Sequence, residues 1–159
     1  MFLVQLQSLT SILLKFLSFA ETVGMAARKG HVVLCVDDEA VGLKVRRILL
    51  ERAGYEVLTA SDGQSGLQMF RTHDVDAVVL DYSMPGMSGG DVARAMRQIK
   101  PDVPILLLSA YVGLHDEVRS IVDIYMTKGE GAPALLERLS NLLTNPSASQ
   151  EIPGTEDPQ

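Results

Sequence analysis

Reactive side chains lie at the C-terminal ends of four largely apolar runs in this sequence. They are Asp37 and Asp38 after the run 32–36, Asp81 after 77–80, Ser109 after 105–108, and Lys128 at the end of 123–128. Short apolar runs rich in β-branched residues are typical of buried strands. Because the carboxyl ends of parallel strands meet at one edge of a sheet, we expect these side chains to converge there.

The convergence of three carboxylates points to a cation site. Carboxylates that lie close together repel, and each would take a proton unless a cation joins them. Hard oxygen ligands favour Mg²⁺, and Lys128 adds positive charge for an approaching anion that the Ser109 hydroxyl can also bind. This set supports phosphoryl transfer, with Asp81 as the nucleophile that forms an aspartyl phosphate. Since no His or Cys lies at a predicted strand end, neither a triad hydrolase nor a zinc site is favoured.

Each of these residues also has an ordinary structural interpretation. Asp81 could cap a helix or a turn, and the pair Asp37 and Asp38 could stabilise the start of the following helix. Lys128 could be a solvated lysine at a strand end, and Ser109 could simply bond the backbone. Their joint occurrence at four strand ends favours the functional interpretation.

Strands and helices alternate five times between residues 31 and 144. The predicted strands are 32–36, 55–60, 77–80, 105–108 and 123–128, with helices that include 40–53 and 113–122 and a last one carrying the leucine stripe 135–143. Most of these strands are continuous apolar runs, which is typical of a parallel sheet covered on both faces. The predicted fold class is α/β, a doubly wound five-stranded parallel sheet.

The composition restricts the class of protein. Acidic residues outnumber basic ones by 20 to 14 over 159 residues, giving a net charge of −6 that disfavours nucleic acid as a partner. The single cysteine, Cys35, lies inside an apolar run, which is typical of core packing in a reducing compartment. We therefore expect a cytoplasmic protein.

The two ends of the sequence differ from the central part. Residues 1–24 carry apolar side chains at helical spacing, but polar interruptions and the lack of a basic leading region disfavour an integral membrane span and a signal peptide. Three interpretations remain. The segment could be a dimerisation or docking helix, an interfacial membrane helix, or an extension that the working protein lacks because that protein starts at Met25. The expected division is an N-terminal apolar helical extension 1–29, one folded domain 30–144, and a disordered acidic tail 145–159.

The residues at the strand ends resemble a known family. The pair Asp37-Asp38, the run Asp81-x-x-Met84-Pro85-x-Met87-x-Gly89, Ser109-Ala110 and Lys128 resemble the receiver domain of two-component response regulators. The resemblance covers about residues 31–143 and extends to the single-domain receivers of chemotaxis and sporulation phosphorelays. It implies a flavodoxin-like fold.

The resemblance also implies a role for each residue. Asp81 would be the phosphoacceptor. Asp38 and Asp81 would bind Mg²⁺ directly, Asp37 would bind it through water, and the backbone carbonyl of Ser83 would complete the protein ligands. Ser109 and Tyr125 would act as the switch hydroxyl and the switch aromatic. Phosphorylation would then change the surface around the fourth helix and fifth strand.

Two features depart from the family pattern. Gly129 follows Lys128 where the family usually has a proline, and the segment 109–128 is a few residues short, which predicts a truncated fourth helix. The resemblance implies a stand-alone phosphoacceptor regulator rather than an enzyme, with slow autodephosphorylation. A sensor histidine kinase or a histidine phosphotransfer protein would phosphorylate it, and a downstream protein target would read it. The alternatives are a degenerate receiver that binds a partner independently of phosphorylation, and an aspartate-nucleophile phosphatase. Ser83 disfavours the latter, because such enzymes carry a second acid there.

Overall fold

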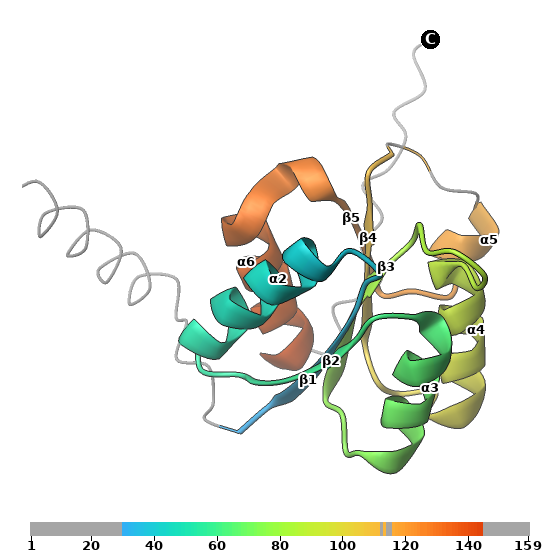
Figure 1. The fold of residues 1–159 in the computed structure, drawn as a ribbon, viewed down its shortest axis with the longest axis horizontal. Coiled ribbons are helices and arrows are strands. Elements are labelled where there is room, and N and C mark those ends of the chain that lie inside the picture. The colour runs from blue at the N-terminus through green and yellow to red at the C-terminus, as the bar shows by residue number, and fades with distance from the viewer. Residues whose placement is uncertain (1–29, 112, 114–115, 145–159) are drawn as a thin grey trace, which may run out of the picture.

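The computed structural model describes residues 30–111, 113 and 116–144 (Figure 1). The predictions for the N-terminal extension 1–29 and for the tail 145–159 lie outside the described residues. Within the described ranges, no helix is both long and apolar enough to cross a membrane.

Five parallel strands form one sheet. They are β1 (Val32–Val36), β2 (Glu56–Ala60), β3 (Ala77–Asp81), β4 (Ile105–Ser109) and β5 (Ile124–Thr127), in the order β2-β1-β3-β4-β5. In this order the winding direction reverses between β1 and β3, which is the arrangement of the flavodoxin-like fold. The predicted fold class is confirmed.

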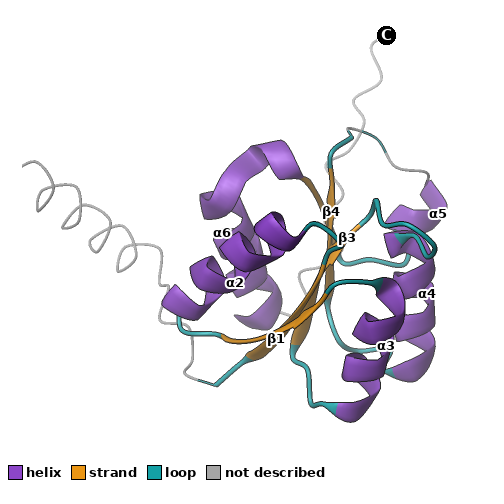
Figure 2. Ribbon diagram, in the orientation of Figure 1, coloured by secondary structure: helices purple, strands orange, loops and turns teal. Residues whose placement is uncertain are grey.

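The helices lie in two layers, one on each face of the sheet (Figure 2). The first layer contains α2 (Ala40–Arg52) and α6 (Gly131–Thr144); the second contains α3 (Gly63–Thr72), α4 (Gly89–Ile99) and α5 (Asp116–Arg119). A short 3₁₀ helix, η1 (Lys128–Glu130), joins β5 to α6.

Alternate residues of the central strands pack into opposite layers. In β1, Leu34 and Val36 belong to the core under α3 and α4, whereas Val33 and Cys35 belong to the core under α2 and α6. Every residue of β3 and of β4 is buried. Coverage of both faces explains why these strands are continuous apolar runs in the sequence.

The strand register brings the reactive strand ends to one level. Val36 pairs with Leu80, so the residues that follow them, Asp37 and Asp81, leave the sheet side by side. Ser109 pairs with Thr127, which places Lys128 one residue beyond that pair.

One sequence-based expectation needs correction. The helix predicted over 113–122 ends at Arg119. The chain turns at 120–121, and Asp123 then accepts the backbone N–H of Ile105 at 2.7 Å, which ties this segment to the start of β4. The remaining predicted bounds agree to within one or two residues. In α2, Val41 and Val45 recur at helical spacing, but they are 70% and 58% exposed, so this side of the helix does not face the sheet.

The side of α2 that faces the sheet has a different composition. Leu50 is fully buried and Leu43 packs against the same core. Arg46, which lies three residues after Leu43 and four before Leu50, has a side chain only 14% exposed. A charged residue therefore occupies the buried side of this helix next to the carboxyl edge of the sheet.

Candidate functional site

Three acidic residues gather at the carboxyl ends of β1 and β3. One carboxylate oxygen from each of Asp37, Asp38 and Asp81 lies within 4.8 Å of the others. Asp37 and Asp81 are buried, at 1% and 2% exposure, whereas Asp38 is open to solvent. The structure thus brings the acids singled out in the sequence into one cluster with a solvent-exposed side.

Asp37 is bonded through both of its carboxylate oxygens. Oδ1 accepts the backbone N–H of Glu39 at 2.7 Å, and Oδ2 forms an ion pair with Arg46. The same Oδ2 lies 3.5 Å from Nζ of Lys128. The Asp37 backbone N–H donates to Ala60 at 3.1 Å, which fixes the turn at the end of β1.

Asp81 has a buried oxygen that lacks a hydrogen-bond donor. Nζ of Lys128 lies 2.9 Å from Oδ1 of Asp81, close enough for an ion pair. The contact does not have hydrogen-bond geometry, and Oδ1 has no other donor among the residues that the structure describes. Burial of a carboxylate oxygen without a hydrogen bond is unfavourable, and the Lys128 charge offsets part of that cost. This favours a cation or an incoming ligand at Oδ1.

The donor set fits a hard divalent cation. The three acids supply carboxylate oxygens only, and no His or Cys belongs to this group in the described part of the chain. Oxygen ligands of this kind suit Mg²⁺, whereas a zinc site would use imidazole or thiolate.

A close contact between α4 and β3 positions Asp81. The Gly89 N–H donates to the Tyr82 carbonyl at 2.9 Å, and the Tyr82 N–H donates to Leu108 at 2.8 Å. A Cβ at Gly89 would lie 2.3 Å from the Asp81 carbonyl oxygen, so only glycine permits this approach. In the same loop Gly86 has a φ of 82°, a left-handed conformation that glycine adopts without strain.

The two predicted switch residues contact the backbone of one residue. Ser109 is fully buried at the end of β4, and its Oγ accepts the Tyr111 N–H at 3.1 Å. The Tyr125 hydroxyl donates to the Tyr111 carbonyl, and the Tyr125 ring lies 5.3 Å from Arg119. Ser83, the remaining predicted residue, is exposed in the loop directly after β3.

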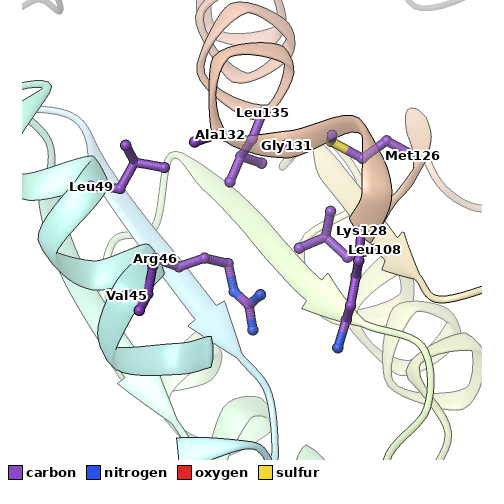
Figure 3. A pocket seen from close by; sticks show the side chains of 9 residues that line it. All are labelled: Val45, Arg46, Leu49, Leu108, Met126, Lys128, Gly131, Ala132 and Leu135. Atoms are coloured by element: carbon purple, nitrogen blue, oxygen red, sulfur yellow. The ribbon is translucent and has the colours of Figure 1, made fainter. Parts of the chain in front are cut away.

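Arg46 also belongs to this site, although no motif of the sequence singles it out. Figure 3 shows Arg46 of α2 and Lys128 of η1 extending from opposite walls of a cavity towards the same edge of the sheet. Burial lowers the pKa of Arg46, while Cys35 and Asp81 oppose that shift. The sequence feature that could have indicated this role is the position of Arg46 on the side of α2 that carries Leu43 and Leu50, which pack against the core.

The family model for the response regulator receiver domain matches residues 33–140. The chain belongs to this receiver family. Among curated relatives, the cell cycle response regulator CtrA of Brucella ovis is 34% identical over 112 residues, or 69% of this chain and 48% of the relative. The chain therefore spans about half the length of the curated relatives it matches.

Solved receiver structures have the same fold. The response regulator TrrA of Thermotoga maritima, in complex with Mg²⁺ and BeF, is 35% identical with a TM-score of 0.68, covering 71% of this chain and 99% of that one. TrrA in complex with the histidine kinase ThkA is 36% identical with a TM-score of 0.67, covering 72% and 99%. These comparisons assign the chain to two-component signal transduction.

One departure from the receiver pattern has a structural replacement. The residue after Lys128 is not proline, and the described residues contain no cis peptide bond. Instead, Glu130 accepts the Thr127 N–H at 2.8 Å and pairs with Arg138, which also donates to the Tyr125 carbonyl at 3.1 Å. These side chains fix the loop that carries Lys128.

Proposed function

We propose that this receiver is a phosphoacceptor regulator in which Asp81 takes a phosphoryl group from a phosphohistidine donor. The observation that carries the proposal is the buried Asp81 carboxylate, whose Oδ1 lacks a hydrogen-bond donor and lies 2.9 Å from Lys128. Asp37 and Asp38 stand beside it. A buried nucleophile with an adjacent cation and two further acids supports phosphoryl transfer better than a purely structural role.

Mg²⁺ is the proposed cofactor. Asp38 and Asp81 would bind it directly and Asp37 through water, with the Ser83 carbonyl as a further ligand. When bound, the ion neutralises negative charge on the transferred oxygens. The exposure of Asp38 gives the ion a route from solvent, and the complex of TrrA with Mg²⁺ and BeF supports the same chemistry here.

The reaction forms one bond and breaks one. A carboxylate oxygen of Asp81 attacks phosphorus, the N–P bond of the donor breaks, and the donor imidazole keeps the electron pair. Lys128 exchanges its contact with Asp81 for one with a phosphoryl oxygen. Slow hydrolysis of the acyl phosphate restores Asp81, so the chain acts as a timed regulator rather than as an enzyme with an external substrate.

The signal would pass through Ser109 and Tyr125. If the Ser109 hydroxyl turns to the phosphoryl group, it leaves the Tyr111 N–H that it now accepts. Because the Tyr125 hydroxyl bonds the Tyr111 carbonyl, the movement reaches the Tyr125 ring and the neighbouring Arg119. The surface formed by α5 and β5 would then change and would be read by a downstream protein target.

The phosphodonor would be a sensor histidine kinase or a histidine phosphotransfer protein. Val41, Val45 and Ile48 are exposed on α2, the helix that directly follows the acidic pair, and offer such a donor an apolar contact surface. The complex of TrrA with ThkA supports this class of partner. The cytoplasm, where Cys35 stays reduced, is the proposed location.

A second candidate is a receiver that binds its partner without phosphorylation. The ion pair between Arg46 and Asp37 favours it, because an acid of the cluster is already neutralised by a side chain. Phosphorylation itself separates the two candidates.

The test is intact-mass spectrometry after incubation with acetyl phosphate, with and without Mg²⁺. We expect one phosphoryl adduct that requires Mg²⁺ and is absent from Asp81→Asn. The matched control Asp74→Asn removes the same charge at an exposed position and should still form the adduct. An unchanged adduct in Asp81→Asn would refute the assignment. A wild-type chain that neither forms the adduct nor binds beryllofluoride would support the second candidate.

A further inference from the structure

A second cation, besides Lys128, lies inside the acidic cluster. The guanidinium of Arg46 forms an ion pair with Oδ2 of Asp37, and both partners are sheltered, with side chains 14% and 1% exposed. Nζ of Lys128 lies 3.5 Å from the same Oδ2. Oδ2 of Asp37 is therefore shared by two side-chain cations. Arg46 and Lys128 extend from opposite walls of the cavity (Figure 3).

The extra cation changes the charge that a metal ion meets. The three carboxylates contribute −3 and the two side-chain cations +2, so the cluster carries −1. With Lys128 alone it would carry −2. Affinity for hard divalent cations rises with the net negative charge of the ligand set, so Arg46 lowers the attraction at this site.

The guanidinium also has space into which it can withdraw. Arg46 and Lys128 line a cavity of about 190 Å³ between α2 and α6, whose walls include Leu49, Met126 and Leu135. The Arg46 stem can lie against these apolar walls while its charged end moves away from Asp37. Loss of the Asp37 contact therefore does not require α2 to move.

We propose that Arg46 is a built-in competitor of the divalent cation: it neutralises Asp37 while the metal is absent and must release Asp37 for tight metal binding. The inference rests on the proposed function in taking Mg²⁺ as the cation. Its consequence is a receiver whose metal site fills only at a higher Mg²⁺ concentration than the three acids and Lys128 alone would require. Arg46 is thus a positioning residue that acts through Asp37.

The test is calorimetric titration of the full chain with Mg²⁺. The variant Arg46→Gln keeps most of the stem and removes the charge, and its dissociation constant should fall about tenfold, the order expected for a unit charge beside a divalent cation in a solvent-accessible site. The matched control is Arg47→Gln. Arg47 lies on the same helix, is exposed and pairs with Glu51 at 2.7 Å, so this change alters net charge equally and should leave the dissociation constant within about twofold.

Thermal unfolding gives a second readout. Without Mg²⁺, Arg46→Gln leaves the buried Asp37 carboxylate without its nearest cation, so its midpoint should fall below that of the wild type. Saturating Mg²⁺ should raise the midpoint further in Arg46→Gln than in the wild type or in Arg47→Gln. Arg46→Lys, which keeps the charge and tests the site should the Gln variant fail to fold, should bind Mg²⁺ no more tightly than the wild type.

The outcomes separate this inference from the proposed function. Equal Mg²⁺ affinity in Arg46→Gln and Arg47→Gln, or a tighter site in Arg46→Lys, would overturn the competition while leaving phosphorylation of Asp81 intact. Weaker binding in Arg46→Gln would also overturn it, because Arg46 would then support the metal. If none of the chains bound Mg²⁺, the competition and the proposed cofactor would fail together.

Discussion

Replacing Gly89 with alanine tests how the fold positions Asp81. Gly89 begins α4, and its N–H donates to the Tyr82 carbonyl at 2.9 Å. An added Cβ would lie 2.3 Å from the Asp81 carbonyl oxygen and 2.7 Å from the Tyr82 Cα. Both neighbours are backbone atoms, so no side-chain rotation can relieve the clash, and either the end of β3 or the start of α4 must shift.

Two opposing effects set the size of this change. Alanine is favoured over glycine in a helix by about 1 kcal/mol. Overpacking against well-packed neighbours costs about 1–3 kcal/mol, and contact with backbone places Gly89→Ala at or above the upper end. We therefore expect a net loss of about 2 kcal/mol in the free energy of unfolding. With an m-value of about 2 kcal/mol/M in urea, the urea midpoint falls by about 1 M.

The assay is urea unfolding followed by circular dichroism, combined with the acetyl phosphate reaction. Two glycine-to-alanine variants are controls: Gly129 has no atom within 4 Å of the added Cβ, and Gly90 would meet the side chain of Val118 at 3.2 Å. Gly129→Ala should unfold within about 0.5 kcal/mol of the wild type, and Gly90→Ala should lie between the two. If Gly89→Ala matched Gly129→Ala in both stability and phosphorylation, the close approach would not be what positions Asp81.

Three further predictions follow from other contacts. Arg97→Gln should lose about 1–3 kcal/mol of unfolding free energy, because Arg97 pairs with Asp123 and donates to three backbone carbonyls; an unchanged urea midpoint would contradict this. The Ser65 N–H and hydroxyl lower the pKa of Asp62, so this carboxylate stabilises the fold above about pH 4 and the contribution is lost as the pH falls through its folded pKa. Urea midpoints of Asp62→Asn should lie below those of the wild type at neutral pH and converge with them in acid, and a gap that persists would argue against the linkage. Burial raises the pKa of Cys35 to about 12, so a thiol reagent should modify the folded chain only as fast as it unfolds, and rapid native labelling would contradict its burial.

The fold could be predicted because its central strands are covered on both faces. β3 and β4 are buried at every residue, so each is an apolar run whose end is visible in the sequence. Parallel order then requires that Asp37, Asp81 and Lys128 lie at one edge. The close approach of Gly89 to the Asp81 carbonyl gives a physical reason for glycine at that position of the motif.

The rest of the site depends on contacts that spacing does not encode. The spacing of Val41 and Val45 indicates a helix but not which of its sides faces the sheet. The burial of Arg46 therefore could not be predicted from the sequence. Nothing in the sequence indicates that Ser109 and Tyr125 both bond the backbone of Tyr111. These contacts form only when separate elements pack together.

The same holds for the loop that carries Lys128. Its fixation by Glu130 and Arg138 joins η1 to α6, two elements whose contact the residue pattern does not reveal. The residue pattern likewise does not reveal the contact that Asp123 makes with β4 after the early end of α5 at Arg119.

The most direct test of the central claim is to locate the phosphoryl group within the chain. After reaction with acetyl phosphate and Mg²⁺, borohydride reduces an aspartyl phosphate to homoserine, and tandem mass spectrometry of the peptides identifies the residue converted. We expect homoserine at Asp81, at neither Asp37 nor Asp38, and only when Mg²⁺ is present. Conversion at another acid would contradict the assignment of Asp81 as phosphoacceptor, and equal conversion without Mg²⁺ would contradict the proposed cofactor.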